Sequence, residues 1–181
     1  MLDGSAVRCL AGICASLALL ASMPFGARAY EGQATLGLAV GYAGMPRAES
    51  PPRNGIDVAL SGGAGIGDAW SIQGLLGYNV LPDDSPLHVS MAGLETVYAL
   101  DIVRFVPLLG FGLDGLLTVR DRAARGDFAL HALVGFDFLI NRRWLIGADA
   151  RGYWVATNAK SVIDAFFLTV AVRVGLRFDL R

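Results

Sequence analysis

Residues 166–180 read FFLTVAVRVGLRFDL, and large apolar side chains occupy every second position of this stretch. The apolar set starts at Phe166 and ends at Leu180, whereas the positions between them, from Thr169 to Asp179, are small, polar or charged. A period of two residues is typical of a β-strand whose two faces meet different surroundings. The stretch therefore predicts a strand with one aliphatic face and one face of small and charged residues.

The same alternation recurs in seven earlier segments, and no helical period persists after Tyr30. These segments are 35–42, 56–61, 70–79, 87–99, 104–114, 128–138 and 144–154, of which 87–99 is the least regular. Strands of about 9 to 11 residues suit a tilted crossing of the hydrocarbon layer of a membrane. Together with 166–180, the segments predict an all-β fold, an eight-stranded antiparallel up-and-down transmembrane β-barrel.

Four of the linkers between these segments are polar and carry Pro, Gly, Asn or Asp, as surface loops do. They are residues 43–54, 81–86, 118–127 and 156–164. The joints that alternate with them, near Gly67–Asp68, Asp101 and Asn141–Arg142, are tight. This order predicts long loops at one end of the barrel, and short turns with both chain ends at the other, periplasmic end.

The N-terminus carries the one long apolar run. The chain of 181 residues is 54% hydrophobic with a mean hydropathy of +0.51, yet only Cys9–Met23 approaches the length of a membrane-spanning helix. Arg8 precedes this run, and Ala27-Arg28-Ala29 follows it as a cleavage site. We therefore predict a signal peptide over 1–29 and a mature barrel domain over 30–181, with a retained membrane anchor as the alternative.

The segment to be removed also contains both cysteines, Cys9 and Cys14, so we expect no thiol chemistry in the mature chain. Its removal takes away Arg8, Arg28 and Asp3. Of the 15 basic and 16 acidic residues in the full chain, 13 and 15 then remain, a formal charge of −2. This balance indicates no nucleic-acid partner.

A soluble lipocalin-like barrel is the structural alternative, since it would turn its large apolar residues inward. The small-residue face, however, carries too few charges to solubilise an exterior, so the sequence favours an aliphatic face turned to lipid. Aromatic residues on that face should then gather at two levels, one near each membrane surface. The two predicted sets are Trp70, Phe105, Phe136, Trp144 and Phe178, and Tyr42, Tyr78, Phe128, Trp154 and Phe166.

With these features the chain resembles the class of small outer-membrane barrels that includes OmpX and the transmembrane domain of OmpA. The resemblance covers the whole mature chain and rests on the signal peptide, the eight segments and the terminal alternation of Val174, Leu176, Phe178 and Leu180. The family usually ends on an aromatic residue, whereas this chain ends on Arg181. The resemblance implies a monomeric integral protein of the Gram-negative envelope with a plugged interior. It also implies that the barrel-assembly machinery and periplasmic chaperones are partners during biogenesis.

Charged residues on the predicted inward face could form a pore, a proton path or a closed network of ion pairs. A lone buried charge costs several kcal/mol whereas a paired one is tolerated, so we predict the network. Its expected members are Asp57, Glu95, Asp114, Asp137, Asp149, Asp179, Arg104, Arg151, Arg173, Arg177 and His131. The register predicts that Asp114 faces His131 and that Asp149 lies within diagonal reach of Arg173. We predict no catalytic, cofactor-binding or metal-binding residue among them.

An enzymatic alternative rests on His88-Val89-Ser90, which looks like the His-x-Ser motif of outer-membrane lipid A deacylases. Glu95, the nearest acid, falls on the opposite face from Ser90 under strict alternation. A β-bulge near Ala92–Gly93 would turn His88, Ser90 and Glu95 inward and leave Val89, Met91 and Leu94 in lipid.

The sequence favours a structural or surface-interaction role over catalysis. Outer-membrane lipid and lipopolysaccharide are the expected partners. Arg120, Arg122 and Arg125 make the third predicted loop basic enough to meet lipopolysaccharide phosphates. A surface adhesin or recognition protein and a lipid A-modifying enzyme are the alternatives.

Overall fold

The computed structural model describes residues 32–46, 53–67, 69–82, 85–100, 104–121, 123–156 and 165–180. The predicted signal peptide and its cleavage site before Tyr30 lie outside the described residues. No helix in the described part of the chain is long and apolar enough to cross a membrane.

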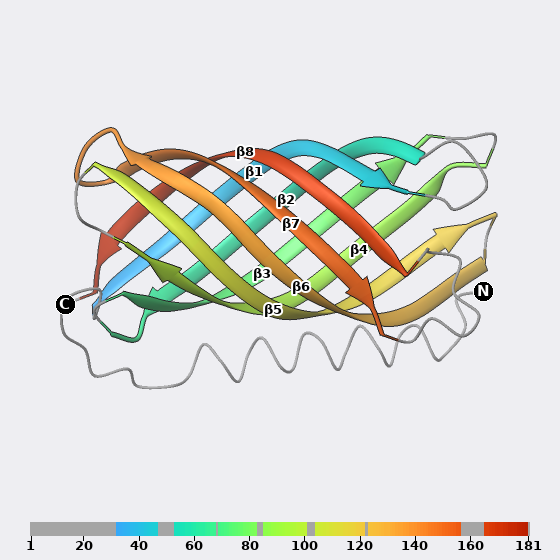
Figure 1. Ribbon diagram of the computed structural model, residues 1–181, viewed down its shortest axis with the longest axis horizontal. Helices are drawn as coiled ribbons and strands as arrows, with labels where there is room; N and C mark the ends of the chain where they lie inside the picture. The colour runs from blue at the N-terminus through green and yellow to red at the C-terminus, as the bar shows by residue number, and fades with distance from the viewer. Residues whose placement is uncertain are drawn as a thin grey trace.

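Eight antiparallel strands close into one barrel, as the alternation predicts, with β8 paired to β1 (Figure 1). The strands are β1 (Gln33–Met45), β2 (Arg53–Gly65), β3 (Trp70–Leu81), β4 (Leu87–Ala99), β5 (Phe105–Arg120), β6 (Ala123–Leu139), β7 (Trp144–Val155) and β8 (Phe166–Asp179). Each strand pairs with its neighbours in the chain, so the topology is a simple up-and-down meander. The end that joins β1 to β2, β3 to β4, β5 to β6 and β7 to β8 is called the loop end below, and the opposite end the turn end.

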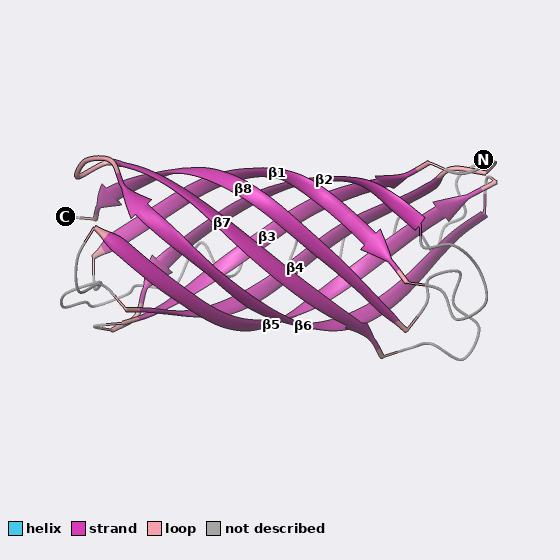
Figure 2. Ribbon diagram, turned by 45° about the horizontal axis from the view of Figure 1, so that its top comes forward, coloured by secondary structure: helices cyan, strands magenta, loops and turns pink. Residues whose placement is uncertain are grey.

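The strands are steeply tilted (Figure 2). A row of paired residues that starts at Ala34 on β1 returns to the same strand at Gly44, ten positions further on. The row passes through Ala64, Ile72, Thr96, Phe111, Ala132, Gly152 and Leu168. Strand number and stagger together determine the tilt of a closed barrel, typically about 35–45°. The bore of so small a barrel is narrow enough for side chains to fill it.

The two faces of the wall differ as the sequence predicts. Large apolar side chains point outward from every strand, with exposures that reach 64% at Leu113 and 66% at Phe128. The alternate positions point inward and are buried, for example Ala171 and Arg173 on β8. Because side chains alternate across a strand, one choice of face for each strand determines the whole wall.

Strand boundaries agree with three of the four predicted loops and with all three tight joints. The prediction of a loop over 118–127 is wrong: Arg120 pairs with Ala123, so only two residues connect β5 to β6. Asp121 has a φ of 48°, the left-handed conformation that a two-residue hairpin turn requires. A run of charged residues indicates contact with water. It does not distinguish a loop from a strand that extends beyond the rest of the barrel wall.

The β-bulge proposed for Ala92–Gly93 is absent, because β4 keeps one uninterrupted register with both β3 and β5. Val89 and Met91 therefore point into the barrel, with exposures of 1% and 4%, and not toward lipid. The irregular sequence of 87–99 reflects apolar side chains on the inward face near the loop end, where they pack against other inward residues.

Candidate functional site

The centre of the barrel holds a chain of ion pairs contributed by four strands. His131 on β6 lies between two carboxylates: its Nδ1 faces Asp114 on β5, and its Nε2 lies 3.1 Å from Oε2 of Glu95 on β4. Arg151 on β7 donates to both oxygens of Glu95, at 3.3 and 3.2 Å, and also binds Asp149. All five side chains are buried, and they are called the central ion chain below.

The histidine ring is held by both of its nitrogens. A carboxylate without a proton can only accept hydrogen bonds, so both contacts of His131 are hydrogen bonds when the ring is an imidazolium. The ring of Tyr153 packs against His131 with centroids 5.2 Å apart, and it also stacks on Phe167 with centroids 4.3 Å apart. The imidazole therefore contacts side chains on β4, β5 and β7, and it links these three strands to β6.

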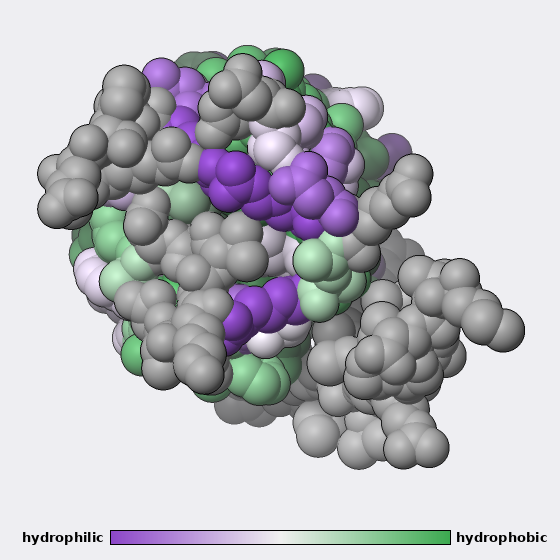
Figure 3. All heavy atoms as spheres, turned by 90° about the vertical axis from the view of Figure 1, so that its right-hand side faces the viewer, coloured by the Kyte–Doolittle hydropathy of each residue, from purple (hydrophilic) through white to green (hydrophobic). Residues whose placement is uncertain are grey.

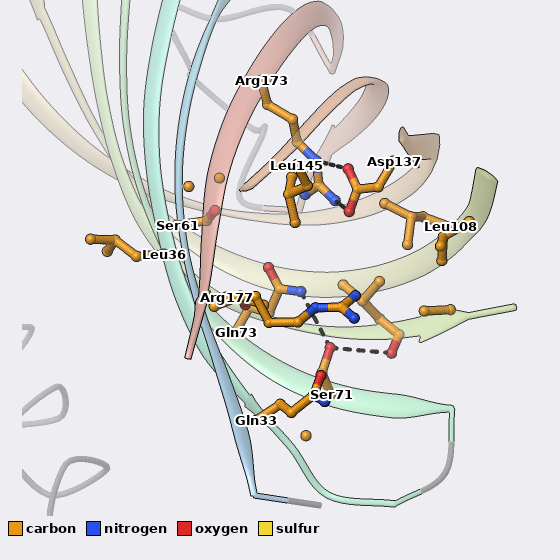
Figure 4. Close-up of a pocket in the computed structure, with 17 residues that line it drawn as sticks. Gln33, Leu36, Ser61, Ser71, Gln73, Leu108, Asp137, Leu145, Arg173 and Arg177 are labelled. Carbon is orange, nitrogen blue, oxygen red and sulfur yellow. Dashed lines mark hydrogen bonds and ion pairs between the residues drawn. The ribbon is translucent and has the colours of Figure 1, made fainter. Parts of the chain in front are cut away.

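A second ion pair lies nearer the turn end. Arg173 donates to Asp137 through Nε at 2.7 Å and through Nη2 at 2.5 Å, the two-pronged geometry that best fits a guanidinium to a carboxylate (Figure 4). The pair borders a small cavity of about 40 Å³ whose polar lining includes Gln73 and Arg177. A space of this size accommodates a few water molecules.

Glycines make room for these charges across the strand pairs. A Cβ atom on Gly112 would lie 2.5 Å from Cε1 of His131, and one on Gly147 would lie 2.3 Å from Oδ1 of Asp137. Gly93 stands in the same relation to Asp114, at 2.1 Å from Oδ1. Charged residues and glycines are thus packed as pairs, which explains why the inward face carries so many small residues.

Most of the predicted inward charges are buried, and the Asp114–His131 pair is confirmed. Three are exceptions, because the inward face opens to solvent where the strands end: Arg104 and Asp179 are exposed, and Arg177 is half-buried. Asp149 pairs with Ala171 and so lies diagonal to Arg173, as predicted, but the hydrogen-bonded ion pairs join Arg173 to Asp137 and Asp149 to Arg151.

Two buried charges escaped the sequence interpretation. Arg53 and Asp127, with exposures of 5% and 4%, were assigned to loops but belong to β2 and β6. The signal that could have found them is the alternation itself, which continues from Ala129 through Asp127 to Arg125 on the inward face.

Buried apolar side chains point into the bore on the loop side of the central ion chain. Figure 3 views this end and shows hydrophobic residues around the circumference, with hydrophilic ones toward the middle. Beneath that mouth, a cluster of buried residues crosses the barrel, and its large members include Met45, Leu75, Leu87, Tyr153 and Phe167. A smaller apolar cluster, which includes Val97, Val106 and Leu133, lies toward the turn end.

His88 and Ser90 lie on the outward face of β4, and Glu95 points into the barrel. The ring of His88 stacks on Tyr78 with centroids 6.0 Å apart, and its Nδ1 lies 2.8 Å from the Tyr78 hydroxyl. The wall of the barrel therefore lies between Glu95, the nearest acid in the sequence, and the His88–Ser90 pair. Among the described residues, no group of three or more His, Cys, Asp or Glu side chains could hold a metal ion.

No family model and no curated protein matches this sequence. The structure is similar to that of neisserial surface protein A, with 13% identity, a TM-score of 0.64, and coverage of 82% of this chain and 97% of that one. It is also similar to Ail, the attachment invasion locus protein of Yersinia pestis, at 15% identity, TM-score 0.56, and coverage of 81% and 99%. The outer membrane protein OprG from Pseudomonas aeruginosa matches at 10% identity, TM-score 0.55, and coverage of 86% and 100%. The shared feature is the fold, that of small outer-membrane barrels.

Proposed function

We propose that this chain is an integral outer-membrane protein with a filled, non-conducting barrel and a structural or surface-interaction role. The observation that carries the proposal is the apolar wall: every strand turns large hydrophobic side chains outward, all the way round a closed barrel. A soluble monomer rarely exposes an apolar patch of more than a few hundred Å². Hydrocarbon is the surrounding that makes such a wall stable, and a closed barrel leaves no unpaired strand edge in it.

Aromatic contacts at both ends of the wall support a membrane-spanning position. Trp70 packs on Tyr98 at 4.9 Å between ring centroids, and Phe105 packs on Phe136 at 5.1 Å, both near the turn end. Near the loop end, Trp154 packs on Phe166 at 5.5 Å. Two separated levels of aromatic rings are typical of the two headgroup layers that a barrel crosses.

The first test uses gel mobility. Mature protein refolded in detergent is expected to resist SDS at room temperature and to migrate faster unboiled than boiled, because a closed barrel has no free edge at which unfolding can begin. The measurement is the mobility of paired boiled and unboiled samples. Identical migration of the two samples would favour the soluble barrel instead.

The filled interior leads to a second prediction. Planar-bilayer recordings are expected to show no large, stable conductance steps, because the central ion chain and the apolar cluster at the loop end occupy the bore. A large porin inserted in the same bilayer serves as the positive control. Regular porin-like steps from this protein would contradict the filled interior.

The geometry of β4 favours a non-enzymatic role. A serine nucleophile needs a histidine base that is oriented by a third group, commonly a carboxylate. Glu95 lies across the wall from Ser90, and Tyr78 is the neighbour of Nδ1 of His88. We therefore infer that the His88–Ser90 pair does not deacylate lipid A.

The third test compares the lipid A mass profile of cells with the parent protein, with Ser90→Ala, and without the gene. We expect three identical profiles, because the parent protein leaves lipid A unmodified. Loss of one acyl chain in cells with the parent protein, reversed by Ser90→Ala while gel mobility stays unchanged, would establish the enzyme and overturn the structural role.

The expected orientation places the turn end, where β1 begins and β8 ends, in the periplasm and the loop end outside. Lipopolysaccharide and the barrel-assembly machinery remain the expected partners, and a monomer the expected state. The basic residues of the third predicted loop support lipopolysaccharide binding less than the sequence suggested. Arg120 lies 3.8 Å from Asp121, and Arg125 lies 3.4 Å from Asp127, so acidic neighbours offset these two charges.

A further inference from the structure

Asp57 is a buried acid outside the central ion chain. It lies on the inward face of β2, and its side chain is 2% exposed. Among the described residues, none forms a hydrogen bond or an ion pair with its carboxyl group. The other buried acids in the described part of the barrel each contact a basic side chain; they are Glu95, Asp114, Asp127, Asp137 and Asp149.

The basic side chains of the central ion chain are committed to other carboxylates. Arg151 and Asp149 on β7 act on Asp57 across the bore, with opposite signs. The guanidinium of Arg151, however, donates to Asp149 and to Glu95. His131 is likewise held between two carboxylates. Three carboxylates thus face two basic side chains, a formal charge of −1 with His131 protonated, and an ionised Asp57 would make it −2.

The other groups that face Asp57 do not supply the missing positive charge. The strands on either side, β1 and β3, carry no titratable side chain on their inward faces, and Asp57 pairs there with a glycine and with Asn79. Arg53 lies four positions away on the same face of β2 and forms no ion pair with Asp57. Arg173 on β8 is held in its own ion pair nearer the turn end. Tyr153, across the bore, is within electrostatic range but is not a cation.

A second buried side chain indicates what Asp57 binds. Asn79 lies opposite Asp57 in the register of β2 and β3, and its side chain is 1% exposed. Neither its amide oxygen nor its amide nitrogen has a hydrogen-bond partner within the described part of the chain. Residues opposite each other in an antiparallel pair have Cβ atoms about 4.5–5.5 Å apart, which a change of side-chain rotamer can bridge. A protonated carboxyl group and an amide are complementary, since each has both a donor and an acceptor.

We propose that Asp57 binds a proton in the folded barrel and donates it in a hydrogen bond to the amide oxygen of Asn79. The proton removes a charge that no cation offsets, and a buried charge without a partner costs far more than a hydrogen-bonded neutral acid. In the unfolded chain, Asp57 meets water and releases its proton above about pH 4. The inference goes beyond the proposed function, and it holds whether the wall of the barrel meets lipid or water.

The extra proton makes the barrel more stable in mild acid. Where the folded state binds one proton more than the unfolded chain, the unfolding equilibrium constant rises by up to about tenfold for each pH unit. This stabilisation is fully present below about pH 4, and it is lost as the pH rises until Asp57 releases its proton in the barrel. An aspartate that is ion-paired in the folded state gives the opposite sign, because its stabilisation is lost as the pH falls.

The test compares the mature protein with Asp57→Asn in phospholipid vesicles, by urea unfolding followed by tryptophan fluorescence. Asparagine has the shape of a neutral aspartic acid and cannot ionise. We expect the unfolding equilibrium constant of the parent, divided by that of Asp57→Asn, to rise about five- to tenfold from about pH 5 to about pH 6. The division cancels the contribution of His131, which both proteins contain. A ratio that is constant over this range, or that falls as the pH rises, would overturn the proposal.

Asp137→Asn is the matched control. Asp137 is also a buried, inward-facing aspartate, but its carboxylate pairs with Arg173. At about pH 6, we expect this variant to raise the unfolding equilibrium constant at least about 100-fold, because it leaves Arg173 without a partner. Asp57→Asn is expected to be at least as stable as the parent. Equal losses in the two variants would show that Asp57 is a charged member of the network, contrary to the proposal.

Infrared spectroscopy of the folded protein locates the proton directly. A protonated carboxyl group has a carbonyl stretch separate from those of carboxylates and backbone amides. We expect this band in the parent in mild acid and its loss in Asp57→Asn. Asn79→Ala removes the proposed acceptor and is expected to shift the band to higher frequency. A band of unchanged intensity in Asp57→Asn would assign the proton to another acid and refute the site, and a band that Asn79→Ala leaves unshifted would refute the bond to Asn79.

Discussion

Glu95→Gln is expected to lower the free energy of unfolding by about 3–5 kcal/mol, the cost of removing one partner from a buried ion pair. Glu95 receives hydrogen bonds from Arg151 and lies 3.1 Å from Nε2 of His131, so its carboxylate contacts two buried basic side chains at once. Glutamine has nearly the same shape but no charge. The measurement is urea unfolding of the protein refolded into phospholipid vesicles, followed by tryptophan fluorescence.

Two further variants make this result interpretable. Asp179→Asn removes an exposed carboxylate at the end of β8 and is expected to change stability by less than about 0.5 kcal/mol. Glu95→Asp retains the charge and is expected to recover part of the loss, even where Glu95→Gln fails to fold. A loss below about 1 kcal/mol for Glu95→Gln would mean that the central ion chain does not stabilise the barrel in the way described.

Leu113→Arg is expected to cost about 2–4 kcal/mol in vesicles, the penalty for an arginine on the lipid face near the bilayer midplane. Leu113 lies midway along β5 and is 64% exposed, so its side chain has neither a packed core nor water around it if the wall faces lipid. In a soluble barrel, the same substitution at an exposed position would change stability by less than about 0.5 kcal/mol. The unfolding free energy of the two proteins in vesicles measures the difference.

Leu180→Arg is the matched control for this effect. Leu180 is 54% exposed and follows the last residue of β8, at the turn end. An arginine near the membrane surface costs about 0–1 kcal/mol because its side chain can reach the headgroups. Equal, small effects at Leu113 and Leu180 would contradict a membrane-spanning wall, whatever the gel mobility shows.

The exterior of the barrel was the more predictable part of the molecule. Alternation along 166–180 identifies β8 and its outward face, and the same rule assigns the outward residues of the other strands, from Leu36 on β1 to Trp154 on β7. The predictions failed where composition was used in place of alternation. The polar run 118–127 was interpreted as a loop although its alternation continues, and the apolar inward residues Val89 and Met91 suggested a bulge in β4 that does not exist.

The sequence by itself determined the number of strands, the face that most of them turn outward and most of the charged residues from which the interior is built. These are local properties, since a strand with a period of two residues needs no information from its neighbours to separate its faces. Only the tertiary structure decided the partners. The registers of β6, β7 and β8 put Asp137, Gly147 and Arg173 in one row, and those of β4, β5 and β6 put Glu95 and His131 in another, where Glu95 also receives Arg151. Stagger depends on all eight pairings together, because a shift in one pair moves every later row around the closed barrel.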